Sequence, residues 1–147
     1  RKMFSVGLHA NTLITSQSLF KNYTATILSL SGYEPLPDMQ TYFLPEYRAS
    51  QFVGGGINLI FTPRKNFDLR FDGYYFQPFK QLVINADGTF GYSKPFKGEK
   101  TAAALSGIYH SPIGPLRLTL NYFPAQAKPF LFQFTFGYII FNERAIR

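Results

Sequence analysis

Few side chains in this 147-residue sequence have the chemistry for catalysis or metal binding. His9 and His110 are its histidines, and the absence of cysteine excludes thiolate metal sites and a disulfide framework. Acyl transfer needs a nucleophile, a base and an oxyanion hole brought together, and no serine, histidine and aspartate lie in a context that would assemble them. We therefore expect no catalytic residue, no metal site and no cofactor in this chain.

Two short segments carry weak catalytic signals that have simpler structural interpretations. Gly54-Gly55-Gly56 is glycine-rich like an oxyanion loop, but it lies inside a strand-like run, where glycine marks a bend or close packing. Asp87-Gly88 lies between two β-prone runs, 82–85 and 89–92, and such a dipeptide is a strong hairpin signal. We predict a strand for the first segment and a hairpin for the second.

The better candidates for a functional surface are charged residues that alternate with apolar ones. In residues 66–76, Asp68, Arg70 and Asp72 alternate with an apolar row. Side chains of an extended strand point to opposite faces in turn, so the three ionised groups share one face. A dry protein core would not tolerate that row, which predicts a wet or polar environment on this side of the strand.

The same alternation recurs along the chain and is clearest in residues 130–141. Its even-numbered positions are aromatic or aliphatic, whereas Gln133 and Thr135 occupy the opposite face. Residues 115–123 and 2–13 follow the same period, and 51–62 follows it more loosely. Several strands with one continuous apolar face and one polar face are typical of an antiparallel transmembrane β-barrel, with lipid outside and a polar lumen inside.

This interpretation divides the strand residues into two sets. The predicted lipid-facing set is Phe67, Leu69, Phe71, Leu118, Leu120, Phe132, Phe134, Phe136 and Tyr138. The predicted lumen-facing polar set is Asp68, Arg70, Asp72, Arg117, Thr119, Asn121, Gln133 and Thr135. The charged members could line a conduit or bind a loop inserted into the lumen, but we favour ion pairs across neighbouring strands, with Arg117 as one partner.

Turn signals divide the chain into about seven strands, which we place at 2–13, 19–31, 51–62, 66–78, 101–111, 115–123 and 130–141. Spacing alone places 19–31 and 101–111. The connections 15–18, 63–65 and 112–114 are short and predicted to be periplasmic, whereas 32–50 and 79–100 are long and predicted to face outward. The last strand and residues 2–13 would then both run inward. The proline-rich stretch 34–38 leads into a loop expected to lie across the rim or mouth.

Composition agrees with a membrane strand protein. Aromatic residues make up 18% of the chain, and no run approaches the roughly 20 apolar residues of a membrane helix. The net charge of +7 would suit nucleic acid, but the basic residues gather at the two predicted rims, where lipid phosphates lie. We expect contacts with outer-membrane lipid and lipopolysaccharide, and none with nucleic acid.

A family resemblance begins at the turn Ser111, Pro112, Ile113, Gly114 and Pro115. This turn and the strand after it resemble the penultimate turn and strand of the surface-antigen superfamily of outer-membrane barrels, which includes BamA-like and TamA-like assembly proteins. From Tyr42 onward the chain is most similar to the C-terminal barrel of the patatin-like phospholipases of Bacteroidetes, in which a lipid hydrolase domain precedes the barrel. The resemblance implies a sixteen-stranded parent, with residues 1–147 as a partial barrel domain holding its last seven strands.

The resemblance also implies a place and a role. The chain would lie in the bacterial outer membrane as an anchor, and a candidate conduit, for an N-terminal patatin-like domain outside this sequence. Further strands or partner chains would close the sheet, because each unsatisfied edge group costs several kcal/mol in lipid. The alternatives are an assembly barrel of the BamA-like class, a porin or receptor, and a soluble β-sandwich with an unusually aromatic core.

Overall fold

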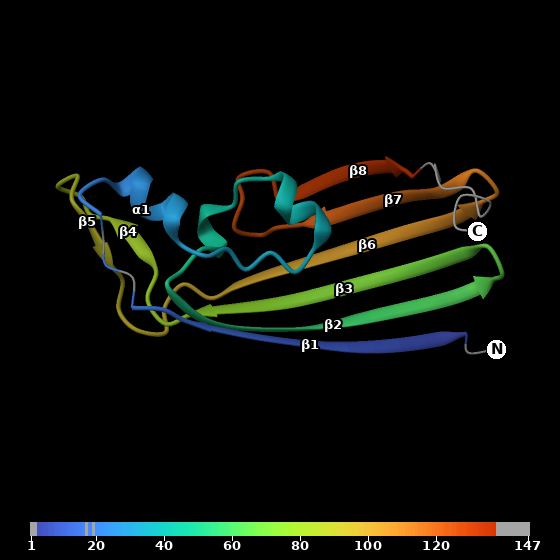
Figure 1. Cartoon of the computed structure of the whole chain (residues 1–147), viewed down its shortest axis with the longest axis horizontal. Helices are drawn as coiled ribbons and strands as arrows, with labels where there is room; N and C mark the ends of the chain where they lie inside the picture. Colours follow the sequence, from blue (N-terminus) through green and yellow to red (C-terminus); the bar gives the residue numbers. More distant parts are fainter. Residues whose placement is uncertain (1–2, 17, 19, 138–147) are drawn as a thin grey trace, which may run out of the picture.

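In the computed structural model, which describes residues 3–16, 18 and 20–137, six strands form one antiparallel sheet (Figure 1). Neighbouring strands follow the order β1-β2-β3-β6-β7-β8. Their bounds are Phe4–Ile14 for β1, Gln51–Arg64 for β2, Phe67–Pro78 for β3, Lys100–Ser111 for β6, Gly114–Tyr122 for β7 and Phe130–Phe136 for β8. The prediction of an all-β antiparallel architecture is confirmed, and the sheet is open, with β1 and β8 at its edges.

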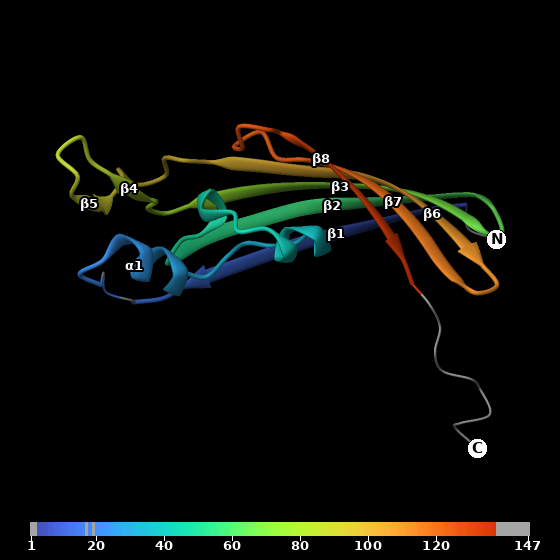
Figure 2. The same cartoon turned by 90° about the horizontal axis from the view of Figure 1, so that it is seen from above.

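The sheet is curved, and the segment between β1 and β2 lies on its concave side (Figure 2). We call the described residues between these strands, 15–16, 18 and 20–50, the covering segment. The cross-strand register keeps alternate residues in line, so Asn58 on β2 pairs with Asp72 on β3, which pairs with Ala104 on β6. We call the sheet face that carries Asp72 the concave face and the opposite one the convex face.

Short turns join the strands at one end of the sheet and long connections at the other (Figure 1). The family turn motif forms a tight hairpin in which Ser111 pairs with Gly114, and the Ser111 hydroxyl donates to the Gly114 carbonyl oxygen at 2.5 Å. Gly114 has a φ of 148°, which is open to glycine and disfavoured for other residues. The motif therefore serves as the turn between β6 and β7, as its sequence predicted.

The predicted strand 19–31 is wrong, because its centre forms helix α1, Tyr23–Ser29. The Asn22 carboxamide oxygen accepts hydrogen bonds from the backbone N–H of Thr24 at 2.7 Å and of Ala25 at 3.4 Å, which caps the first turn. Ile27 and Leu30 follow at helical spacing and are buried. The segment 15–18, predicted as a short turn, is instead the start of the covering segment.

Losing that strand changes the direction of β1. Residues 2–13 were predicted to run in the same direction as 51–62, with a strand between them. The structure instead pairs β1 directly and antiparallel with β2, from Phe4 opposite Phe61 to Ile14 opposite Gln51. The sheet thus contains six long strands rather than the predicted seven, and the whole covering segment connects two neighbours.

The covering segment supplies half of the main hydrophobic core. It contains two short 3-10 helices, η1 at Pro37–Thr41 and η2 at Pro45–Tyr47. Its buried members are Tyr33, Leu36, Met39, Leu44, Tyr47 and Ala49. They pack on Phe52, Tyr74, Phe76, Ala102 and Ala104 of the sheet and on Phe123, which directly follows β7. The segment was expected at the rim or mouth, and it reaches onto the concave face itself.

The hairpin around Asp87-Gly88 is confirmed as a small separate sheet. Strands β4, Leu82–Ile84, and β5, Phe90–Tyr92, pair antiparallel, and Gly88 adopts a positive φ of 82°. Leu82 packs with Ile27 and Leu30 of the α1 region, and Phe90 and Tyr92 border this second cluster. Within the described ranges, no helix is long and apolar enough to cross a membrane.

Candidate functional site

The predicted lipid-facing residues that the structure describes lie together on the convex face. Leu69, Phe71, Leu118, Leu120, Phe132, Phe134 and Phe136 are all exposed, with Phe132 66% and Phe134 62% accessible, and Phe67 is half-buried. Tyr138 lies outside the described residues. Together with Phe4, Val6, Leu8, Val53, Ile57, Phe61, Leu105 and Tyr109, these side chains form an exposed apolar layer across all six strands. A layer of this extent needs an apolar environment or partner.

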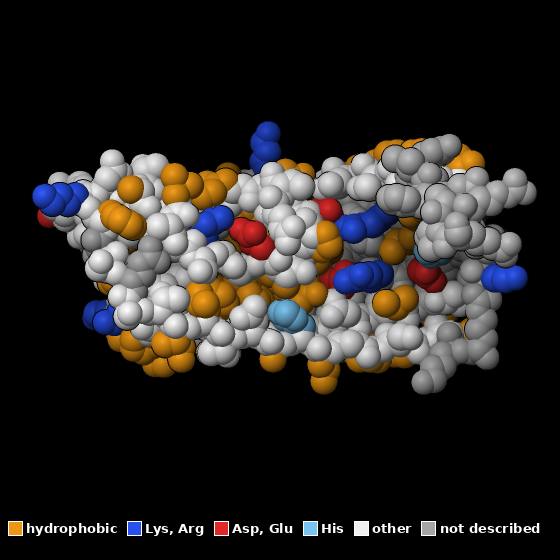
Figure 3. Space-filling view, in the orientation of Figure 1, with side chains coloured by type: hydrophobic (Ala, Val, Ile, Leu, Met, Phe, Trp, Pro, Cys, Tyr) orange, Lys and Arg blue, Asp and Glu red, His pale blue; other side chains and the backbone are white. Residues whose placement is uncertain are grey.

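The predicted lumen-facing residues lie on the concave face, where charged and histidine side chains gather (Figure 3). Asp72 is almost fully buried there, and its two carboxylate oxygens share the single Nε–H of the Arg70 guanidinium, at 2.8 and 2.9 Å. Asn58 donates from its amide nitrogen to Asp72 and to the Tyr74 hydroxyl oxygen, the latter at 2.6 Å. A buried carboxylate is retained when it is paired and hydrogen-bonded in this way.

A second polar group lies near the short turns and is more open to solvent. Asp68 accepts a hydrogen bond from the Thr62 hydroxyl at 2.6 Å and contacts the His110 ring nitrogen Nε2 at 2.8 Å. His110 lies near the end of β6, as predicted, and its side chain is half exposed. Across the strands, Asp68 thus contacts a histidine of β6, whereas Asp72 forms its ion pair with Arg70 along its own strand.

Arg117 has a different partner from the one that the sequence suggested. Its guanidinium donates from Nη2 to Asp38 at 2.9 Å, and Asn121 donates to the same Asp38 oxygen at 3.0 Å. Asp38 lies in η1 of the covering segment and is 5% exposed. The pairing of Arg117 with strand carboxylates was therefore wrong. Arg117 instead binds a segment that lies over the sheet, which was the alternative prediction for the charged residues of this face.

Thr119 and Ser106 complete this network between β6 and β7. Their hydroxyl oxygens lie 3.0 Å apart, and the Arg117 Nε donates to Thr119 at 2.8 Å. Both threonine and serine are buried, as is Asn121. The two remaining predicted residues lie on β8, where Gln133 is half-buried and Thr135 is exposed. Arg117 is thus held from two sides, by a strand hydroxyl and by the covering segment.

Further hydrogen bonds fasten the covering segment. The Tyr47 hydroxyl donates to the Thr101 carbonyl oxygen at 2.5 Å, and Gln126 donates to Glu46 at 2.8 Å. Arg48 donates to the Leu30 carbonyl oxygen at 2.8 Å and pairs with Glu34 at 3.2 Å. These bonds join β6, the β7–β8 connection and the segment itself into one layer across the long-connection half of the concave face.

Some buried polar atoms on the concave side have no hydrogen-bond partner among the described residues, and two of them lie on the edge strands. His9 Nε2 is on β1, and Gln133 Oε1 is on β8. The Tyr33 hydroxyl, beside His9, is a third. Two further atoms, Arg48 Nε in the covering segment and Asn121 Oδ1 on β7, lie away from the edges, so these atoms are spread over the concave side rather than confined to β1 and β8.

Sequence reasoning missed Asp38 and Tyr33, because it treated their segment as a loop at the rim. Gly54 and Gly56 were the available signal: a Cβ atom at Gly54 would overlap the Tyr33 ring, and one at Gly56 would overlap Tyr74.

In the part of the chain that the structure describes, no three histidine or acidic side chains are grouped to hold a metal ion. No protein-family model, curated protein or solved structure significantly matches this chain.

Proposed function

We propose that this chain is a wall segment of a transmembrane β-barrel in the bacterial outer membrane, where it anchors a larger protein. The observation that carries the proposal is the contrast between the two faces of one sheet. The convex face exposes apolar side chains from every strand, while the concave face holds buried carboxylates, amides and hydroxyls. That contrast is the one expected between a lipid-facing and a lumen-facing surface.

Strand dimensions and side-chain placement support the proposal. Strands β1, β2, β3, β6 and β7 contain 11, 14, 12, 12 and 9 residues, which meets the roughly 9–11 residues needed to cross a bilayer. Aromatic residues lie on the convex face near both ends, with Tyr75 and Tyr122 at one end and Phe61 and Tyr109 at the other. Such positions suit the aromatic girdles of membrane barrels.

The open edges define the missing part. In lipid, unsatisfied N–H and C=O groups along β1 and β8 would cost several kcal/mol each, so further strands have to close the wall. The rest of the barrel would come from additional residues of the same protein or from partner chains.

The covering segment favours an anchor over an open conduit, because it fills the long-connection half of the concave face with a packed core. The anchored cargo is inferred from sequence alone: the resemblance to patatin-like phospholipases makes a lipid hydrolase domain before Arg1 the proposed partner. The chain itself supplies the membrane wall and its lining.

Membrane residence is tested by arginine substitutions at two adjacent positions of β8. Phe134→Arg places a charge on the convex face. It should destabilise the folded protein by about 2–4 kcal/mol if the residue lies near the bilayer midplane. Thr135→Arg places the same charge on the exposed concave side and should be far milder. Folding efficiency of the full-length protein into liposomes measures both, and equal tolerance would contradict the barrel assignment.

A further inference from the structure

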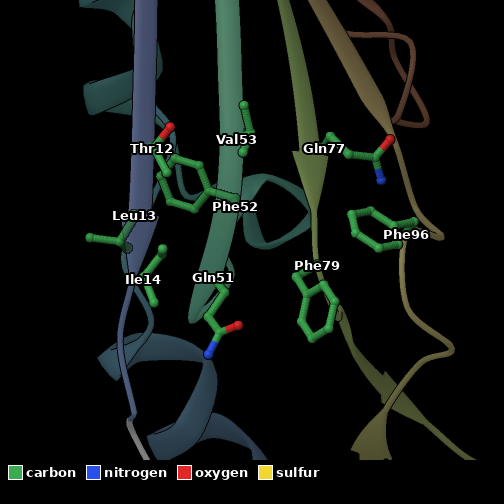
Figure 4. A pocket seen from close by; sticks show the side chains of 9 residues that line it. All are labelled: Thr12, Leu13, Ile14, Gln51, Phe52, Val53, Gln77, Phe79 and Phe96. Atoms are coloured by element: carbon green, nitrogen blue, oxygen red, sulfur yellow. The ribbon is translucent and has the colours of Figure 1, made fainter.

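An apolar depression of about 220 Å³ lies on the convex face beside the long connections (Figure 4). Its walls include Thr12, Val53 and Gln77, which the register places side by side on β1, β2 and β3. Ile14, Gln51 and Phe79 line its next row, and Phe96 borders it from the connection between β5 and β6. The volume is below the roughly 300 Å³ typical of small-molecule pockets, so it suits part of a chain-like ligand.

Phe96 is held at this depression in an unusual backbone conformation. Its φ is 54°, a region that bulky residues rarely adopt, and its side chain is 67% exposed. Its backbone N–H donates to the Phe79 carbonyl oxygen at 2.8 Å, and the two rings meet edge to face with centroids 5.2 Å apart. The turn therefore holds an exposed aromatic ring at the depression. Unusual backbone conformations of this kind cluster at sites that bind ligands.

One lysine lies over the Phe79 ring, and two more stand close to Phe96 in the sequence. The Lys80 ammonium lies 5.6 Å from the Phe79 ring centroid, and Lys94 and Lys97 flank Phe96 in sequence and are exposed. Among the described residues, these lysines take part in none of the contacts between basic and acidic side chains. An apolar depression with unneutralised cations beside it is complementary to an amphiphile that has an acyl chain and a phosphate-bearing head.

We propose that this depression binds one acyl chain of a phosphorylated glucosamine lipid of the lipid A type, with its phosphates held by Lys80, Lys94 and Lys97. The inference rests on the proposed function, which places the convex face in the membrane and the long connections at its outer surface. A lipid with two phosphates on its headgroup matches the three cations better than a zwitterionic phospholipid does.

The test is a lipid titration of the full-length protein in detergent, followed by native mass spectrometry. Lipid A is compared with its dephosphorylated form and with phosphatidylcholine. Two variants alter the site in different ways: Lys80→Glu with Lys97→Glu reverses charge, and Val53→Trp fills the depression without changing charge. Their matched controls are Lys65→Glu, at the short-turn end, and Leu118→Trp, elsewhere on the convex face.

We expect lipid A to bind the parent protein. The double charge reversal should weaken binding by about tenfold or more, since each cation near a lipid surface contributes a factor of about five, and Val53→Trp should weaken it because the indole ring occupies the space of the acyl chain. The two controls should bind as the parent does. Equal weakening by site and control variants, or equal binding of phosphatidylcholine, would overturn the site. If the proteins still fold in liposomes, that outcome contradicts the lipid site but not the proposed barrel wall. If they fail to fold in liposomes, both proposals are contradicted.

Discussion

Gly54 determines how closely the covering segment approaches the sheet. It has no Cβ, and the Tyr33 ring occupies the space where one would lie, stacked on Phe76 with ring centroids 5.6 Å apart and meeting Phe52 at the same distance. The neighbouring Gly55 points to the convex face, where a Cβ would meet only the His9 carbonyl oxygen, at an ordinary 3.6 Å. A side chain therefore cannot be accommodated at Gly54 without moving Tyr33, whereas the neighbouring Gly55 has room for one.

We predict that Gly54→Ala will lower the free energy of unfolding by about 1–3 kcal/mol, because the added methyl group overpacks the core against Tyr33. Gly55→Ala, one residue away, should be neutral or slightly stabilising, since Gly is disfavoured within strands. Urea unfolding of the two variants in detergent measures the difference. Equal stabilities would show that Tyr33 does not pack there.

Asp38 is the acidic residue through which the covering segment reaches β7. Arg117 and Asn121 both donate to one of its oxygens, and the whole group is largely buried. Removing one partner from a buried charged pair leaves the other without compensation, which is costly. The residue therefore controls how firmly the segment stays on the sheet.

Asp38→Asn should make local opening of η1 easier by about 1.5–3 kcal/mol, the usual contribution of a hydrogen bond to a charged group. Hydrogen exchange at the Met39 and Tyr42 amides, which donate to Leu36 and Met39 carbonyl oxygens, reports that opening. Glu34→Gln breaks the more exposed pair with Arg48 and serves as the control, with a smaller effect. Unchanged exchange in Asp38→Asn would contradict the role of Asp38.

Strand β1 depends on β2 for all its described ladder pairing, and Leu8 lies opposite Ile57 on the convex face. Because the chain has no native cysteine, an engineered pair can be tested without interference. Leu8→Cys with Ile57→Cys should form a disulfide under mild oxidation, since directly opposite residues meet the required Cα separation. Leu8→Cys with Asn58→Cys, on opposite faces, should form none. The reverse result, read by non-reducing electrophoresis, would mean that β1 and β2 are not paired in this register.

The strands that could be predicted are those in which one face differs chemically from the other. Phe67 to Phe76 and Leu116 to Tyr122 alternate clearly, and both are strands. Residues 101–111 are strand too, although Ala102 and Ala104 give little contrast, and only spacing placed them. Residues 19–31 were misassigned because that same spacing argument outweighed the Asn22 cap and the helical interval from Ile27 to Leu30.

The site was less predictable than the sheet, because its decisive contact is remote in sequence. Asp38 and Arg117 are 79 residues apart, and nothing in a proline-rich loop indicates that its aspartate lies against a strand arginine. The polar face itself was predictable from the period of two. Which segment would cover it depended on packing of Tyr33, Leu36 and Tyr47, and their pattern has no regular period.

The two ends of the molecule should differ in their exposure on cells. Lys97 lies in the long connection before β6, whereas Arg64 ends β2 and Lys65 begins the short turn at the other end of the sheet. Trypsin added to intact cells should cut after Lys97 and spare Arg64 and Lys65. Lys94 is a built-in control, because the following Pro95 blocks tryptic cleavage. Fragment masses identify the sites, and cleavage after Arg64 in cells with an unbroken outer membrane would invert the topology.

The placement of residues 15–50 between two neighbouring strands also limits the order in which the molecule can fold. Pairing β1 with β2 closes a far longer loop than pairing β2 with β3, at an entropic cost greater by roughly 2.5 kcal/mol. The contacts of Tyr33 with β3 and of Asp38 with β7 offset this entropic cost, but they form only after those strands are aligned. We therefore expect the hairpins β2–β3 and β6–β7 to form early and β1 to dock late, together with its long connection. In a closed barrel, the covering segment would have to dock on the inner face before the last pair of strands forms its hydrogen bonds. Docking of this segment would therefore limit when the barrel can close.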